Sequence, residues 1–351
     1  MATKRKTLPK VVDELIKTKD IDALIDILSD CQIEAYNTYN QNTIISYRDI
    51  PEDIIRWYVE HGGDVNYVGR WKRTPLDYHA TYFNSSVALL IELGADIAVR
   101  DYMGDTPLHS AATSFKFENV KLLLDAGADI TALNNANATP LYAMLRGVRN
   151  IDLEAAYDIA KYLLEQGDKV TEDMRKEVTR IGTDFEFYRN QINPDFIESM
   201  ECALNGLYQL FDVESVPKRI MNDGTAKIVV NTTKWQDQHQ ELWELLVPGQ
   251  GHATTLQGEA VRITGKVTRE LLDNGGVNWD GEYRKMCDAF LDYLSKGKCK
   301  EKILSELTNL IKEIKKRNVD KEELYRWTQM AVEWVLDNPE PITLKQVNYR
   351  R

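Results

Sequence analysis

The residues best suited to chemistry lie in one stretch of the second half of the chain, between residues 245 and 280. The stretch combines amide, carboxylate, guanidinium and indole side chains, and its candidate polar-site residues are Gln257, Glu259, Arg262, Asn278, Trp279 and Asp280. Two carboxyl groups such as Glu259 and Asp280 would permit general acid–base catalysis if the fold brought both within hydrogen-bond reach of one substrate. Catalysis at this stretch is therefore one hypothesis.

The spacing of the charged residues in this stretch also fits a structural role. Glu259, Arg262, Lys266 and Arg269 recur at helical spacing, which places both signs of charge on one helix face. Such a face is typical of a solvated row of ion pairs, or of a buried polar network that bridges two helices. Asn274-Gly-Gly276 likewise fits a helix-terminating turn better than a ligand cradle.

Established catalytic signatures are missing from the chain. Gly249-Gln-Gly251 lacks the Lys and Ser/Thr of a phosphate-binding loop, and no metalloprotease, nucleophile-elbow or kinase motif occurs. The cysteines are widely spaced, without a Cys-x-x-Cys pair, and are expected to be reduced structural thiols: Cys31, Cys202, Cys287 and Cys299. We therefore predict no catalytic residues, no metal site, no cofactor and no enzyme activity.

Helices are expected to position the polar stretch. Amphipathic periods predict helices over these ranges: 195–211, 235–246, 255–272, 280–294, 302–316 and 320–336. A short beta-type run spans 227–232, and a glycine-rich loop spans 248–252. Residues 195–351 are thus predicted to form a mainly helical C-terminal domain. Its polar stretch resembles a cassette found in otherwise unassigned bacterial proteins, which implies no particular activity.

The first half of the chain repeats itself. Thr-Pro-Leu begins at Thr74, Thr106 and Thr139, so that successive copies are 32 and 33 residues apart, and Gly-Ala-Asp recurs at Gly94 and Gly127. Thr before Pro is a typical helix start, because the hydroxyl caps the first turn and proline does not need an amide there. A glycine such as Gly127 ends a helix, since it tolerates the left-handed conformation. One such unit cannot bury its own apolar face, so at least three must stack.

This motif and spacing closely resemble the ankyrin repeat. The resemblance implies an all-α solenoid of about four repeats plus an N-terminal cap over residues 1–182, followed by a linker at 183–194 and the C-terminal domain at 195–351. Val11–Ile16 and Ile21–Leu28 would form the cap, and 36–48 an elaborated loop. Asp77 and Tyr142 stand where a copy of His109 would stabilise the turn, so those units depart from the family pattern.

The resemblance also implies a protein-binding role, carried by turn tips and inner helices. The tips combine aromatic and guanidinium groups, which are enriched at interface hot spots. The expected partner-binding residues are Tyr67, Arg70, Trp71, Lys72, Arg73, Arg100, Tyr102 and Met103.

Composition limits the classes of partner. The chain has 351 residues, of which 43% are hydrophobic and 28% charged, with a net charge of −11. That composition is typical of a folded protein, and the acidic balance disfavours nucleic acid as a partner. No apolar run reaches about 18 residues, so we expect a cytoplasmic protein that does not bind membranes.

Three functions remain as hypotheses. The first is a protein-binding scaffold, most concretely an immunity-type inhibitor that neutralises a bacterial toxin or other effector by covering its active surface. The second is an enzyme or small-molecule sensor with a C-terminal polar pocket, which the repeats bring to its target. The third is an architectural protein that oligomerises through its helical domain.

Overall fold

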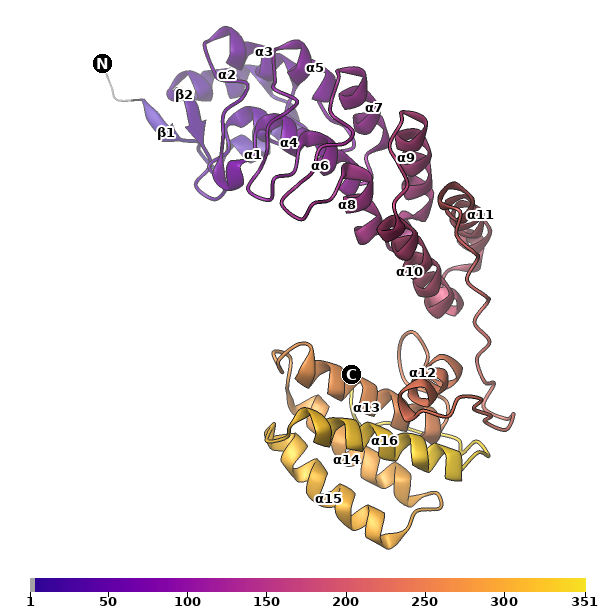
Figure 1. Cartoon of the computed structure of the whole chain (residues 1–351). Helices are drawn as coiled ribbons and strands as arrows, with labels where there is room; N and C mark the ends of the chain where they lie inside the picture. The colour runs from indigo at the N-terminus through magenta and orange to yellow at the C-terminus, as the bar shows by residue number, and fades with distance from the viewer. Residues whose placement is uncertain (1–3) are drawn as a thin grey trace. The chain divides into compact units, whose positions relative to one another are not determined.

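Short helices in the first part of the chain stack in two rows (Figure 1). The structure is a computed structural model and describes residues 4–351. The inner row contains α1 (Val12–Thr18), α4 (Pro75–Ala80), α6 (Pro107–Thr113) and α8 (Pro140–Gly147). The outer row contains α2 (Ile21–Ser29), α3 (Glu52–Glu60), α5 (Val87–Glu92), α7 (Phe117–Asp125) and α9 (Leu153–Glu165). Contacts run along the rows, as between α4 and α6 in the inner row and between α5 and α7 in the outer row. The expected all-α repeat solenoid is confirmed.

The sequence of each repeat explains where its helices begin and how closely they pack. The Thr106 hydroxyl accepts a hydrogen bond from the His109 amide, and Pro107 occupies the first turn of α6. Ala111 and Ala112 are fully buried, and their small side chains let the helices on either side approach. Gly127 has φ +92°, the left-handed conformation that ends α7.

The second repeat is less regular than the others. Its inner helix is reduced to a single 3-10 turn, η1 (Ile44–Ser46), within the segment expected as a loop. Ahead of it, β1 (Arg5–Thr7) pairs in parallel with β2 (Cys31–Tyr36), a strand pair that no pattern in the sequence predicted. Cys31 and Ala35 of β2 are buried, which accounts for its place beside the first helices.

The boundary between the two compact units differs from the expected one. Helix α10 (Glu172–Tyr188) runs into the segment expected as a linker, and a short 3-10 turn, η4 (Arg189–Gln191), follows it. Helix α11 (Pro194–Phe211), assigned to the C-terminal domain from sequence, packs against α9 and joins the first unit, which comprises residues up to 185 together with 194–216. Gly206 explains this packing, because a Cβ there would lie 2.3 Å from Tyr157 Cε2. The apolar stripe of α11 predicts that one face is buried, but not against which helix.

The second unit comprises residues 186–193 and 217–351 and is a helical bundle. Its helices are α12 (Trp235–Leu246), α13 (Leu256–Leu272), α14 (Gly281–Ser295), α15 (Glu301–Lys316) and α16 (Lys321–Asp337). Helix α13 is central and contacts α12, α14 and α16. The segment 227–232, expected as a beta run, forms no strand. Its Ile228 amide bonds to the Pro339 carbonyl, and those of Asn231 and Thr232 bond to the Glu241 carboxylate instead of a neighbouring strand.

The last residues of the chain pack across the start of α13. The Leu256 amide donates to the Ile342 carbonyl at 2.8 Å, and the Leu344 amide donates to the Thr254 carbonyl at 2.9 Å. Tyr349 is buried beside this crossing.

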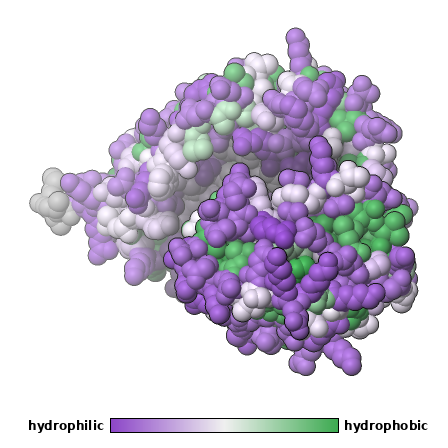
Figure 2. Space-filling view, turned by 60° about the horizontal axis from the view of Figure 1, so that its bottom comes forward, coloured by the Kyte–Doolittle hydropathy of each residue, from purple (hydrophilic) through white to green (hydrophobic). Residues whose placement is uncertain are grey.

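Apolar side chains are mostly enclosed within each unit. The face shown in Figure 2 is largely hydrophilic, and its hydrophobic residues gather in a few separate groups. Among residues 4–351, no helix has both the length and the apolar character needed to cross a membrane.

Candidate functional site

Hairpin-like turns, here called fingers, precede the inner helices and carry six of the eight expected partner-binding residues, while Tyr67 and Arg100 come just before a finger. Three of them span residues 69–73, 101–105 and 134–138, and each is closed by a backbone hydrogen bond from its first amide to its last carbonyl, between 3.0 and 3.1 Å long. A related turn spans 37–42, where the Asn37 amide donates to the Asn42 carbonyl at 2.9 Å. The four fingers repeat with the helices.

Backbone hydrogen bonds join each finger to the next. The Arg70 amide donates to the Asn40 carbonyl at 2.8 Å, and the Tyr102 amide to the Trp71 carbonyl at 3.0 Å. The Asn135 amide donates to Met103 at 2.9 Å. The fingers are therefore one connected edge rather than independent loops.

Buried polar groups at the helix starts fix the fingers to the repeats. His109 Nδ1 lies 2.9 Å from the Thr106 hydroxyl, and His109 Nε2 lies 3.0 Å from the Ala138 carbonyl of the next finger. In the preceding repeat Asp77 replaces this histidine, and its carboxylate accepts the Thr74 amide at 2.8 Å. The capping box thus survives the substitution. At Tyr142 the return bond is lost, and Thr139 alone caps α8.

Aromatic side chains form an exposed patch at the fingertips. The ring of Trp71 lies 5.3 Å from that of Tyr102, and the Arg70 guanidinium lies 5.1 Å from the Trp71 ring. Trp71, Tyr102 and Met103 are 49%, 53% and 46% exposed. Four of the expected residues therefore come together on one surface, here called the fingertip patch: Arg70, Trp71, Tyr102 and Met103.

The other expected fingertip residues are engaged differently. Arg73 donates to the Asp77 carbonyl at 3.0 Å and covers the Tyr78 ring, and Arg100 bridges the carbonyls of Gly104 and Leu133. Both guanidinium groups therefore stabilise the fingers by hydrogen bonds to backbone carbonyls. Tyr67 is half-buried, and burial raises its pKa, whereas Lys72 is exposed.

One exposed aromatic side chain of the finger edge was missed from sequence. Tyr39, 81% exposed, belongs to the finger at 37–42, and its carbonyl oxygen lies 3.4 Å from an Arg70 nitrogen. The Asn-rich composition of 37–42 could have identified this finger, because Asn side chains favour turns.

The candidate polar residues of the second unit separate into three places. Gln257 is fully buried and clamps the end of the chain: its amide nitrogen donates to the carbonyls of Asn338 and Glu340, both at 2.8 Å. Asn278 donates to the Glu270 carboxylate. Trp279 stacks on Tyr283, and Asp280 caps α14.

Glu259 and Arg262 form a buried ion pair on α13. Arg262 Nε donates to Glu259 Oε2 at 2.9 Å, and Glu259 also accepts bonds from the Ala253 amide and the Tyr349 hydroxyl. Burial alone would raise the pKa of Glu259, but the hydrogen bonds and charge of Arg262, together with the hydrogen bonds from Tyr349 and Ala253, outweigh burial and leave this pKa below its ordinary value. Glu259 is thus a saturated acceptor, which fits the buried network rather than an acid–base pair with Asp280.

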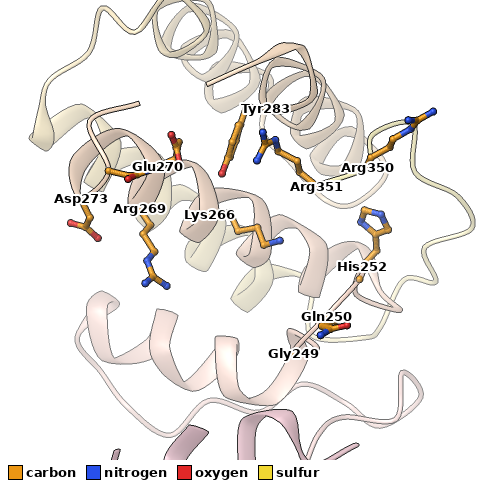
Figure 3. Close-up of a pocket in the computed structure, with 12 residues that line it drawn as sticks. Gly249, Gln250, His252, Lys266, Arg269, Glu270, Asp273, Tyr283, Arg350 and Arg351 are labelled. Carbon is orange, nitrogen blue, oxygen red and sulfur yellow. Dashed lines mark hydrogen bonds between the residues drawn. The ribbon is translucent and has the colours of Figure 1, made fainter. Parts of the chain in front are cut away.

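A separate pocket of about 720 Å³ lies beside this network (Figure 3). It is lined by the loop 249–252, by one face of α13, by Tyr283 of α14 and by Arg350 and Arg351. Among residues 4–351, no group of three His, Cys, Asp or Glu side chains is arranged to hold a metal ion.

Comparison with known proteins supports the repeat assignment. Residues 43–134 match the family model of ankyrin repeats in three copies, a range that runs from η1 to the finger at 134–138. No curated protein matches the chain.

Proposed function

We propose that this chain, an ankyrin-repeat protein, is a cytoplasmic, immunity-type inhibitor that covers the active surface of a bacterial toxin or similar effector with its fingertip patch. Ankyrin repeats indicate a scaffold for protein–protein interaction. The fingertip patch would make the contact and block the partner's active surface. The centre of this contact would consist of Arg70, Trp71, Tyr102 and Met103.

The backbone of finger 69–73 carries this proposal. Trp71 and Lys72 have φ +68° and +55°, although the left-handed conformation costs a residue other than glycine about 1 kcal/mol or more. In the next two fingers the position of Lys72 is filled by Gly104 and Asn137, which tolerate that conformation. Folding alone would favour glycine or asparagine where finger 69–73 has positive φ. Binding to a partner gives a reason for Trp71 and Lys72 to occupy these positions instead.

The charge of the fingertips indicates the chemistry of the partner. Arg70 and Lys72 are exposed, whereas the nearby carboxylates are used within the turns: Asp101 accepts the Met103 amide at 2.7 Å, and Asp105 accepts from the Asn134 side chain at 2.8 Å. The edge therefore presents cations and aromatic rings. An acidic surface with an apolar hollow would complement it.

The test begins with the full chain as bait, followed by purification of the captured protein. Its affinity is then measured for the native chain, for Arg70→Ala/Trp71→Ala and for the control Ile151→Ala, a residue that is 76% exposed but lies between α8 and α9. We expect the double variant to bind at least about 30-fold more weakly, because hot-spot truncations cost about 2 kcal/mol. Retained affinity would reject the fingertip patch.

Inhibition needs a second readout. The partner's own activity is assayed with an equimolar amount of the native chain, and we expect it to fall with the native chain and to persist with the double variant. If the native chain bound the partner without lowering the partner's activity, the protein would be a binding scaffold, and its proposed role as an inhibitor would be contradicted.

A further inference from the structure

The pocket in the second unit is positively charged although the chain as a whole is acidic. Its wall carries Lys266, Arg269, Arg350 and Arg351 against two carboxylates, those of Glu270 and Asp273, whereas the whole chain has a net charge of −11. In Figure 3, Lys266 extends along α13 toward His252, with Arg351 and Tyr283 on the facing side. Cations from two separate segments thus share one concave surface.

Most of these cations form no ion pair among the described residues. Arg351 pairs with Asp280 at 2.8 Å, and Glu270 is held by Asn274 and Asn278. The side chains of Lys266, Arg269 and Arg350 form no ion pair within residues 4–351. Burial, together with the charges of Arg262 and Arg351, lowers the pKa of Lys266. A bound anion would relieve this repulsion.

His252 brings a second kind of polar group to the pocket wall. Its Nδ1 lies 2.8 Å from Arg262 Nη2 and 3.3 Å from Glu259 Oε1, so the buried ion pair holds this side of the ring. Its Nε2 makes no hydrogen bond within the described residues. His252 therefore has one ring nitrogen engaged by the ion pair and one left for a ligand in the pocket.

The buried ion pair positions this wall. Arg262 Nη2 donates to the Arg351 carbonyl at 2.7 Å and lies 2.8 Å from His252 Nδ1, while Glu259 accepts the Ala253 amide at 2.8 Å. One pair thus holds the loop and the end of the chain against α13. The pocket is preorganised before any ligand arrives.

We propose that this pocket binds a small phosphorylated molecule, with its phosphate group between Lys266 and His252 and the rest of the molecule along α13 toward Arg269. A phosphate dianion matches a wall that combines cations with a histidine nitrogen from a different segment. The volume suits a ligand of nucleotide or sugar-phosphate size. The site belongs to the second unit and is independent of the fingertip patch.

Isothermal titration calorimetry on the full chain tests this proposal. The probes are inorganic phosphate, AMP and ATP, with citrate as an anion that lacks phosphate, and the variants are Lys266→Met and Arg269→Gln. Lys312→Met is the matched control, because Lys312 is exposed on α15 and its substitution changes the net charge equally. Circular dichroism verifies that each variant is folded.

We expect at least one phosphate-bearing probe to bind saturably at one site. Its affinity should fall about tenfold or more in each pocket variant, as for the loss of one charge-assisted hydrogen bond, and stay unchanged in Lys312→Met. Absence of saturable binding by every phosphate probe would overturn the proposal. So would equal binding of citrate, or full affinity in a folded Lys266→Met variant.

Discussion

Trp71 and Tyr102 touch across two neighbouring fingers. The Tyr102 amide donates to the Trp71 carbonyl at 3.0 Å, and the two rings lie 5.3 Å apart at an interplanar angle of 51°. The repeat period places the two fingers side by side, and the backbone bond fixes their register. The backbone that carries this half-exposed aromatic pair is thereby fixed, which reduces the entropy that a partner would have to remove on binding.

The contact between these rings should be measurable as a coupling energy. In a double-mutant cycle of Trp71→Ala and Tyr102→Ala, we expect the effects on the free energy of unfolding to be non-additive by about 0.5–1.5 kcal/mol, as for other aromatic pairs. Urea unfolding provides the measurement. The control cycle combines Trp71→Ala with Ile151→Ala, and equal coupling in both cycles would contradict a direct contact.

Lys72→Gly should make the protein more stable. Lys72 has φ +55°, so glycine would relieve backbone strain and raise the free energy of unfolding by up to about 1 kcal/mol. Gly104→Ala is the reciprocal change and should lower stability, because a Cβ there would lie 2.5 Å from Asn135 Oδ1. Chemical denaturation measures the free energy of unfolding of both variants. A loss of stability in Lys72→Gly would contradict the claim that the backbone at Lys72 is strained.

Local residues determine the parts of the fold that the sequence predicted well. Thr106 and Pro107 specify a helix start, and Gly127 a helix end, through interactions within a few residues. The repeat period then specifies the stacking. The turn at Ile44–Ser46 lacks such signals, and the partner of α11 depends on long-range contacts such as that between Gly206 and Tyr157. Neither this turn nor the packing partner of α11 could be predicted from the pattern of neighbouring residues.

The candidate sites show the same limit. The period places Trp71 beside the next finger, so the fingertip patch follows from sequence. The pocket does not, because it joins His252, Lys266 and Arg351 from segments far apart in the chain. Sequence singled out Glu259 and Arg262 by their spacing, and this spacing reflects a buried pair that supports the pocket wall rather than lining it.

Asp77 and His79, which lie in one repeat, should change the stability of the protein in opposite directions as the pH is lowered. Burial lowers the pKa of His79 from 6.5 to about 4, so the unfolded chain binds more protons between these values and stability falls as the pH is lowered through them. Burial raises the pKa of Asp77 from 3.8 to about 6, so the folded chain binds more protons there and stability rises as the pH is lowered. Over most of this window the two effects largely cancel.

Single substitutions should separate these effects. In Asp77→Asn, stability should fall by about 1.4 kcal/mol per pH unit more steeply than in the native chain between pH 6 and 4. In His79→Gln it should instead rise toward acid relative to the native chain. Urea unfolding at several pH values gives the slopes, and the slope difference is unaffected by a constant loss of stability. Parallel slopes in all three proteins would contradict the assignment.

Arg262→Met should test the buried pair at the base of the pocket. The change leaves Glu259 buried without its cation, and we expect a loss of about 3–5 kcal/mol near neutral pH. Without Arg262, burial would raise the pKa of Glu259 above its unfolded value, so stability would be lost as the pH rises through it and the deficit should shrink in acid. Calorimetric unfolding at pH 7 and pH 4.5 measures this difference.

Lys316→Met is the control for Arg262→Met. Lys316 pairs with Glu313 at the same spacing but on an exposed face, so its substitution should lower the free energy of unfolding only slightly at either pH. A deficit in Arg262→Met that is equal at both pH values would show that lost packing, rather than an uncompensated carboxylate, accounts for the cost.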